Sequence, residues 1–137
     1  PNHIPNYEVP VAGSAYPLAM ISPPARNFLN SSFVNVDSLR DIEKEPLVEI
    51  NSLDAAARGI ATGDTVKVFN DRGEYHCKAD VTSRARAGVV NGLGIWWRKM
   101  GLNGTNVNEV TSQLLTDLGR APVFYDCQVE VALLKKA

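Results

Sequence analysis

The segment that most constrains the fold is residues 47–69, where two short apolar runs flank a compact helix signal. Residues 47–51 and 65–69 carry the β-branched and alternating apolar pattern of strands. Between them, Ser52 is a candidate N-cap, an alanine run follows, and Gly59 stands where a helix would end in the left-handed conformation. We therefore expect a strand, a short helix and a second strand in immediate succession.

The connection after this helix follows a local logic. Ile60 is placed to fill an apolar interior, Gly63 permits a tight turn, and Asp64 can accept backbone N–H bonds that fix the entry into the next strand. A Gly-Asp pair before a strand is by itself a common turn. Here it follows a helix and a Gly-Ile step and precedes Val-Lys-Val-Phe-Asn-Asp-Arg-Gly, which makes the pattern more specific.

The rest of the chain is dominated by short strands. A hairpin loop is expected at residues 70–73, with Gly73 in a positive-φ conformation, and a second short helix at residues 112–118. Because strands dominate and helices are short, a closed barrel would remove the strand edges that the chain would otherwise expose. The further expected strands are residues 16–22, 74–81, 89–90 and 123–134, the last with Val129, Val131 and Leu133 on one face.

Composition excludes several classes of protein. The 137 residues suit one domain, and 45% hydrophobic with 21% charged residues is close to a globular average. A net charge of −1 argues against a basic nucleic-acid surface or a polybasic membrane patch, so neither partner is predicted. Two histidines and two cysteines, Cys77 and Cys127, are too few for an iron–sulfur cluster or a Cys/His zinc site, so no metal ligand is predicted. The two cysteines could be half-buried thiols or a disulfide.

The N-terminus differs in composition from the rest. Six of the eight prolines lie in the first 24 residues, which suits an extended connector packed on a surface. We expect residues 1–15 to form a proline-rich arm or linker and residues 16–137 to form the domain. Because the chain starts at Pro1 without an initiator Met, we also expect it to be excised from a longer polypeptide.

The helix–Gly-Ile–turn–Gly-Asp–strand pattern resembles the Gly-Asp box of double-psi β-barrels. The resemblance implies a mainly β, six-stranded double-psi β-barrel of the aspartate-decarboxylase-like fold, with short helices. That fold hosts aspartate decarboxylases, N-terminal domains of AAA+ ATPases and pterin-dinucleotide-binding domains. The fold alone does not determine which of these functions a chain has, so the residues of the loops must distinguish them.

Four segments, in order along the chain, resemble one family. They are residues 18–35 (with Ser22-Pro23, Arg26 and Asn30-Ser31-Ser32), residues 51–55 (Asn-Ser-Leu-Asp-Ala), residues 89–98 (with Gly94 and Trp96-Trp97) and residues 104–125 (with Asn108, Thr111 and Tyr125). The family is the molybdopterin dinucleotide-binding domain, the C-terminal domain of the dimethyl-sulfoxide-reductase and formate-dehydrogenase superfamily. It implies a molybdopterin guanine dinucleotide cofactor carrying Mo or W.

For the first segment, the resemblance implies that the loop after the strand holds the pyrophosphate and pterin of the cofactor. Its residue types suit that role, since Arg26, Asn30, Ser31 and Ser32 all donate hydrogen bonds and one is cationic. Many relatives carry His where this chain has Asn30, and because an amide does not titrate, we expect no protonation role there. The alternative is a polar surface loop with Asn30 as a helix N-cap.

The second segment differs from the family's Asn-Pro-x-Asp-Ala by having Ser52 in place of Pro. The resemblance allows Asn51 or Asp54 to line the guanine or phosphate end of the cofactor. Helix capping by these two side chains is the reading that we favour.

The third segment places two tryptophans after a Gly-rich turn that includes Gly94. An indole face can stack on a pterin or guanine, and its N–H can donate. We expect one of Trp96 and Trp97 to pack in the core or cover a domain seam and the other to approach the cofactor.

The fourth segment resembles the family's Asn-x-Leu-Thr followed by an Asp and an aromatic stretch. The amide of Asn108 can donate to and accept from a pterin edge, so Asn108 is our main candidate for a direct contact. Thr111 and Asp117 are expected to hold the loop, and Tyr125 lies in the aromatic stretch. Many relatives have Lys or Arg near Asp126, so a cation for the phosphates is expected from Arg26 or Arg98.

The implied function is to bind the dinucleotide and pterin part of a bis-(molybdopterin guanine dinucleotide) cofactor as the C-terminal domain of an oxidoreductase. The metal ligand and any iron–sulfur cluster would lie in upstream catalytic domains of the same polypeptide, so we expect no catalysis from this chain in isolation. Two alternatives remain: an AAA+ N-domain-type adaptor or substrate-binding module, and a small subunit of a formylmethanofuran-dehydrogenase-like complex. A self-cleaving decarboxylase reading at Gly13-Ser14 has little support, since that pair precedes the first expected strand.

Overall fold

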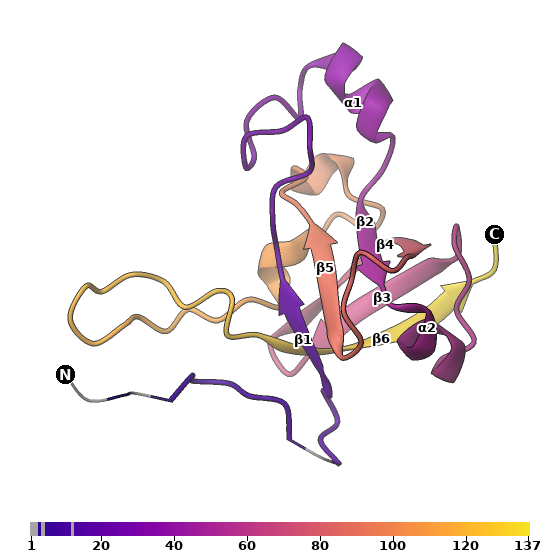
Figure 1. The fold of residues 1–137 in the computed structure, drawn as a ribbon. Helices are drawn as coiled ribbons and strands as arrows, with labels where there is room; N and C mark the ends of the chain where they lie inside the picture. The colour runs from indigo at the N-terminus through magenta and orange to yellow at the C-terminus, as the bar shows by residue number, and fades with distance from the viewer. Residues whose placement is uncertain (1–2, 4, 12) are drawn as a thin grey trace.

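The protein is described by a computed structural model for residues 3, 5–11 and 13–137 (Figure 1). Its six strands close into a barrel with the neighbour order β1-β5-β2-β4-β3-β6, and β6 pairs back with β1. This confirms the predicted mainly β, six-stranded double-psi barrel. The strands are β1 (Leu18–Ile21), β2 (Leu47–Ile50), β3 (Thr65–Asn70), β4 (Gly73–Val81), β5 (Val89–Leu93) and β6 (Gln128–Lys135).

The helices are all short, as expected. They are α1 (Asp37–Glu43), α2 (Ser52–Ala57) and two 3₁₀ turns, η1 (Arg98–Met100) and η2 (Val107–Glu109). Across the described residues, no helix is long and apolar enough to cross a membrane.

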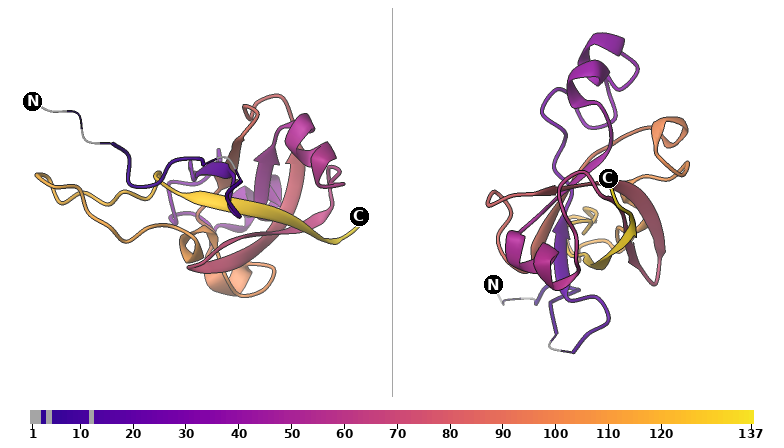
Figure 2. Two further views of the ribbon diagram at one scale, coloured as in Figure 1. Left: turned by 90° about the horizontal axis from the view of Figure 1, so that it is seen from below. Right: turned by 90° about the vertical axis from the view of Figure 1, so that its right-hand side faces the viewer.

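Strand direction determines which loops meet. β1 runs parallel to β5, with Ile21 opposite Asn91, whereas β2 runs antiparallel to β5, with Leu47 opposite Leu93. The chain therefore leaves β1 and β5 at one end of the barrel, which we call the β1/β5 rim, and leaves β2 at the other end, where α2 follows (Figures 1 and 2). The loop at residues 22–36 and η1 both follow strands that end at the β1/β5 rim.

The barrel interior is filled mainly by valines on alternate strand positions, including Val66, Val68, Val129 and Val131, with Leu133 packed against them. This alternation is the period of a sheet with one face buried. A second, smaller cluster lies under the loop at residues 22–36 and contains Phe28 and Trp96. The loops of the β1/β5 rim therefore have an apolar anchor of their own.

The Gly-Asp connection folds as predicted. Gly59 and Gly63 have φ values of 63° and 90°, and Ile60 is buried in the barrel core. The Asp64 carboxylate accepts a hydrogen bond from the Ala61 N–H at 2.8 Å, which closes the turn before β3. One detail was wrong: Asn51, not Ser52, is the N-cap of α2, because its Oδ1 accepts from the Leu53 N–H at 3.0 Å.

The β3–β4 hairpin is present, but Gly73 does not have a positive φ as predicted. Gly73 is instead the first residue of β4. A Cβ at this position would lie 3.1 Å from the backbone oxygen of Glu109. The close approach of η2 to the hairpin, and not a left-handed turn, therefore favours glycine here.

The predicted helix at residues 112–118 is absent, and β6 begins at Gln128, not at residue 123. Residues 113–126 form a protruding loop (Figure 1), in which Leu115 bridges to Pro122. The Ser112 and Thr116 hydroxyls accept bonds from the nearby N–H groups of Leu114 and Ala121. Such local side-chain bonds compete with helix formation.

Helix α1 was not predicted, and none of its residues is buried. Leu39 packs against the smaller core cluster, and the Glu43 carboxylate accepts from the Asn27 N–H and Nδ2, at 2.7 and 2.8 Å. No apolar periodicity was available to signal it.

The arm has neither helix nor strand over residues 3 and 5–11, and Pro1 lies outside the described residues. Tyr7 and Glu8 nevertheless contact the barrel and the protruding loop through hydrogen bonds. Cys77 and Cys127 are free thiols, so the disulfide alternative is wrong, and both are fully buried, not half-buried.

Candidate functional site

A cavity of about 430 Å³ lies at the β1/β5 rim. It is bounded by the loop after β1, the segment after β5, η2 with the residues that follow it, and the protruding loop. We call it the rim cavity. Its lining residues are Ser22, Asn30, Ile95, Asn108, Thr111, Ser112, Pro122, Phe124 and Tyr125. Five of these were candidates from the sequence: Ser22, Asn30, Asn108, Thr111 and Tyr125.

The loop after β1 is fastened to the segment after β5 by backbone bonds. The Gly94 N–H donates to the Pro23 oxygen at 3.0 Å, and the Gly94 oxygen accepts from the Ala25 N–H at 2.7 Å. Asn30 has a φ of 52°, in the left-handed region that Asn tolerates better than most residues, and its oxygen accepts from the Ile95 N–H at 3.3 Å. Asn30 is therefore a bend residue of the cavity and not a helix N-cap, since the N-cap of α1 is Val36.

The two tryptophans have different environments. Trp96 is buried, with its ring packed edge-to-face on Phe28 at a centroid separation of 5.1 Å. Trp97 is half-buried, its Nε1–H donates to the Ser31 oxygen at 2.7 Å, and the Lys99 Nζ lies 5.0 Å from its ring centroid. Trp96 belongs to the buried part of the smaller core cluster, whereas Trp97 packs against that cluster and remains partly exposed.

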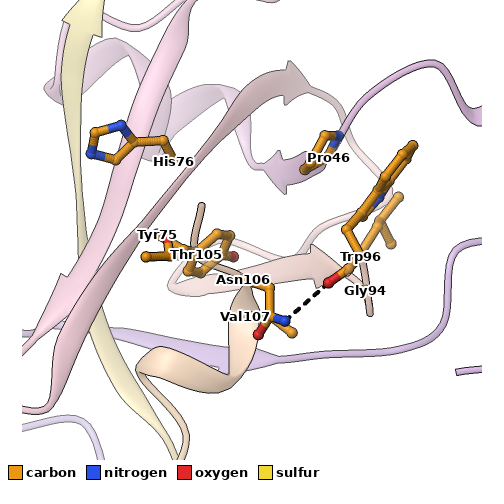
Figure 3. A pocket seen from close by; sticks show the side chains of 9 residues that line it. Pro46, Tyr75, His76, Gly94, Trp96, Thr105, Asn106 and Val107 are labelled. Atoms are coloured by element: carbon orange, nitrogen blue, oxygen red, sulfur yellow. Dashed lines mark hydrogen bonds between the residues drawn. The ribbon is translucent and has the colours of Figure 1, made fainter. Parts of the chain in front are cut away.

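Asn106 has a structural role at the site that the sequence analysis missed. Its Nδ2 donates to the backbone oxygen of Trp96 at 2.9 Å, a bond drawn in Figure 3. Its Oδ1 accepts from the Asn108 N–H at 3.0 Å and so caps η2. One side chain thus joins the tryptophan segment to Asn108. The signal was an Asn directly before a short polar turn, which is a typical cap position.

The space around Asn106 is nearly filled. Figure 3 shows Val107, Trp96 and Gly94 on the walls of a pocket of only about 10 Å³. A Cβ on Gly94 would lie 2.9 Å from the Val107 Cγ1. Gly94 is therefore required by close packing, and it shapes the rim without presenting a side chain.

Asn108 and Thr111 are coupled. The Thr111 Oγ1 donates to the Asn108 backbone oxygen at 3.2 Å, which agrees with the expectation that Thr111 holds the loop. Asp117 also acts locally, since its Oδ1 accepts from the Leu118 N–H at 2.8 Å. The hydrogen bonds found among the described residues do not use the Asn108 side chain, which leaves its amide available in the cavity wall.

The two arginines near the rim, Arg26 and Arg98, are both exposed but differ in their ionic partners. Arg98 forms an ion pair with Glu109. Arg26 is exposed on the loop after β1 and is absent from the ion pairs of the described part of the chain. Ser31 and Ser32 are exposed on the same loop. Of the two arginines, Arg26 is therefore the one that forms no ion pair with the described residues.

Asn51 and Asp54 do not reach the rim cavity, because β2 ends at the opposite end of the barrel. Besides capping α2, Asn51 donates from Nδ2 to the Ala85 oxygen at 2.9 Å. The Asp54 carboxylate accepts from the Gly88 N–H at 2.8 Å. The favoured reading of capping is confirmed for Asn51, and Asp54 holds the turn before β5.

The chemistry of the rim cavity suits a planar, polar ligand. Hydroxyls, two amides and two aromatic rings line it, and its volume lies within the range of about 300–1,000 Å³ that is usual for small-molecule sites. In the described ranges, no three His, Cys, Asp or Glu side chains are grouped so as to hold a metal ion. These residues fit the organic part of a pterin dinucleotide.

Comparison with known proteins agrees with this geometry. Residues 18–128 match the family model described as the Molydopterin dinucleotide binding domain. The chain belongs to this family. The molybdopterin dinucleotide-binding domain therefore takes the cofactor that the sequence resemblance implied. The match does not support an adaptor of the AAA+ type or a small subunit of a formylmethanofuran-dehydrogenase-like complex.

Two curated relatives extend the match. The "Probable oxidoreductase YoaE" of Bacillus subtilis (strain 168) is 34% identical over 128 residues, which cover 93% of this chain and 19% of the relative. The dimethyl sulfoxide reductase DmsA of Escherichia coli (strain K12) is 37% identical over 119 residues, covering 84% of this chain and 14% of that protein. The domain therefore spans less than a fifth of the length of either relative.

The fold has a counterpart among solved structures. Acetylene hydratase from Pelobacter acetylenicus superimposes with a TM-score of 0.75 at 16% sequence identity, over 85% of this chain and 18% of that one. This likeness establishes the barrel architecture.

Proposed function

We propose that the rim cavity binds the pterin and dinucleotide portion of molybdopterin guanine dinucleotide, and that this chain contributes binding and not catalysis. The observation that carries the proposal is the convergence of five sequence candidates, from two of the four resembling segments, on one cavity. Family membership supplies the chemical class of the ligand.

Each wall has a distinct part in this proposal. The Asn108 amide donates to and accepts from the edge of a pterin, while the Ser22 hydroxyl and the Asn30 amide add donors on the facing loop. Tyr125 offers a planar surface for stacking in the cavity, and Trp97, which follows β5 but does not line the cavity, offers a second one. Arg26, with Ser31 and Ser32 on the same exposed loop, serves the pyrophosphate.

We also infer that the reaction belongs to a larger oxidoreductase of which residues 16–137 are one domain and residues 1–15 the connecting arm. The relatives are several times longer than the matched region, which supports this inference. When bound, the cofactor supplies a redox-active Mo or W held by pterin dithiolenes, with its protein ligand from another domain. The residues of this chain orient the cofactor and exclude water from it.

The test is the substitution Asn108→Ala in the intact protein, compared with Asn103→Ala. Asn103 is an exposed asparagine on the same connection that does not line the cavity. Removing one hydrogen bond of about 1 kcal/mol weakens cofactor binding about fivefold. The readouts are the metal content and the guanine nucleotide released per protein after acid treatment.

We expect both contents to fall together in Asn108→Ala and to stay at the wild-type level in Asn103→Ala. Equal cofactor contents in the two variants would refute the assignment of Asn108. Tyr125→Ala then tests the opposite wall of the cavity in the same way.

A further inference from the structure

The protruding loop forms the outer wall of the rim cavity, which it reaches through Pro122, Phe124 and Tyr125. Its other residues pack weakly: Leu118 is 93% exposed and Leu114 is 52% exposed. The backbone bonds within it are local, such as those from Thr116 to Ala121 and from Val123 to Leu114. A segment with so few buried contacts is expected to open at low cost unless something else holds it.

Tyr7 supplies that attachment. Its backbone N–H donates to the Asp126 Oδ2 at 3.0 Å, and its hydroxyl donates to the Leu115 backbone oxygen at 3.1 Å. Among the described residues, these two bonds are the hydrogen bonds that join the protruding loop to a distant part of the chain. They attach both ends of the loop to the arm, one near its start at Leu115 and one at its end at Asp126.

The arm is itself anchored to the barrel one residue later. The Glu8 carboxylate forms a two-point ion pair with the Arg72 guanidinium and accepts from the Gln128 N–H at the start of β6, at 2.9 Å. Burial raises the pKa of Glu8, but the hydrogen bonds from Arg72 and Gln128 outweigh it and lower the pKa below its ordinary value. Glu8 therefore stays charged and attached to the barrel at neutral pH.

The arm meets residues of the loop that do not line the rim cavity. Tyr7 and its neighbours Pro5 and Asn6 line a separate cavity of about 190 Å³, together with Val123 and Asp126 of the loop. The arm runs beside the protruding loop in two views at right angles (Figures 1 and 2). The loop thus contacts the arm through one set of residues and lines the rim cavity through another.

We propose that the arm is a strap that sets the position of the cavity wall, with Tyr7 and Asp126 as positioning residues that determine how firmly the domain retains its cofactor. The inference rests on the proposed function of the rim cavity, and it adds a residue outside the domain match to the binding machinery, since the match begins at residue 18.

The test measures two quantities in the full chain: amide hydrogen exchange of residues 113–126, and the rate at which bound cofactor is lost on dilution. Tyr7→Phe removes the bond to Leu115 and keeps the ring, and Asp126→Ala removes the acceptor for the Tyr7 N–H. Asp126→Asn keeps an oxygen acceptor and is the rescuing variant. Tyr16→Phe is the matched control, because its hydroxyl donates to Asp71 at the β3–β4 turn, away from the loop.

We expect exchange in residues 113–126 and the cofactor loss rate each to rise about fivefold in Tyr7→Phe and Asp126→Ala. Asp126→Asn and Tyr16→Phe should match the wild type. Unchanged exchange in Tyr7→Phe and Asp126→Ala would overturn the strap whatever happens to the cofactor.

Tyr7→Phe and Asp126→Ala could speed exchange in residues 113–126 and leave the cofactor loss rate unchanged. This result has two interpretations, which the cofactor loss rate of Asn108→Ala distinguishes. If Asn108→Ala loses cofactor faster, the cavity assignment stands and the link between strap and retention is overturned. If Asn108→Ala also retains the cofactor, the proposed function of the cavity fails, and the link fails with it.

Discussion

The carboxylate of Asp64 accepts a hydrogen bond from the backbone N–H of Ala137 at 2.9 Å, which joins the turn before β3 to the segment after β6. The same side chain accepts from the Ala61 N–H at 2.8 Å and from the Lys136 Nζ at 3.0 Å. These partners, with the Ala61 N–H foremost, lower the pKa of Asp64 from 3.8 to about 2. The Gly-Asp connection that most constrained the fold is therefore also held to the segment after β6, through the charged carboxylate of Asp64.

Asp64 should make the barrel sensitive to acid in a defined range. Because its pKa is lower in the folded chain, its contribution to stability is complete above about pH 4 and is lost as the pH falls through about 2. Urea unfolding between pH 2 and 6 should show a smaller loss of stability in Asp64→Asn than in the wild type. Asp41→Asn, at an exposed carboxyl on α1, is the control. An identical acid response in Asp64→Asn and the wild type would contradict the prediction.

Gly94→Ala should destabilise the barrel, because its Cβ would lie 2.9 Å from the Val107 Cγ1. Overpacking of this kind costs about 1–3 kcal/mol. Adding Val107→Ala removes the clashing methyl group, so the double variant should lose less stability than the sum of the two single losses. Gly119→Ala, whose Cβ would have its nearest contact at 3.7 Å, should change the unfolding free energy by less than about 0.5 kcal/mol. Strict additivity would show that the two residues do not clash.

Substitutions of the two tryptophans should affect different quantities: Trp96 mainly the stability of the domain, and Trp97 mainly cofactor binding. Trp96→Ala leaves a void against Phe28 and should cost about 3–5 kcal/mol of unfolding free energy. Trp97→Phe removes the hydrogen bond to the Ser31 oxygen, which should cost about 1 kcal/mol of unfolding free energy. It should also change the tryptophan fluorescence signal of cofactor binding and the rate of cofactor release. Thermal unfolding and cofactor release, measured on the same samples, check both. A large loss of stability in Trp97→Phe, with altered cofactor release only in Trp96→Ala, would mean that the roles of the two tryptophans are exchanged.

Asn106→Asp is a nearly isosteric test of the link between Trp96 and Asn108. The substitution keeps the acceptor for the Asn108 N–H but replaces the donor to the Trp96 oxygen with a second acceptor. We expect a loss of about 1–3 kcal/mol in unfolding free energy, together with lower cofactor content. Asn103→Asp, on the exposed part of the same connection, serves as the control. Wild-type stability in Asn106→Asp would show that the bond to Trp96 has no structural weight.

The two thiols should be inert in the folded domain. Burial raises the pKa of Cys127 to about 11 and raises the pKa of Cys77 still further above its ordinary value. Since the thiolate is the reactive form, a thiol reagent at pH 8 should label neither residue until the domain unfolds. Labelling in native buffer and in concentrated guanidinium chloride, followed by mass spectrometry, measures this. Fast labelling of Cys127 alone in native buffer would indicate that the arm and the protruding loop open to expose it.

Features with local causes were predictable. The capped helix α2, the buried Ile60 and the turn closed by Asp64 depend on residues within a few positions of one another. Resemblance then located most of the rim, including Ser22 and Asn108. Helix α1 was missed because it buries no residue, and the protruding loop was mistaken for a helix because its polar side chains bond to their own backbone.

The sequence by itself determined that this chain would be a six-stranded barrel and which loops carried candidate ligands for a pterin dinucleotide. Only the tertiary structure decided which of those loops meet. Asn51 and Asn108 both lie in segments that resemble the family, yet β2 runs antiparallel to β5 and takes Asn51 to the far end of the barrel. The pairing direction of strands is set by contacts between residues far apart in the chain. For the same reason only the fold could bring Tyr7 to Asp126 across 119 positions.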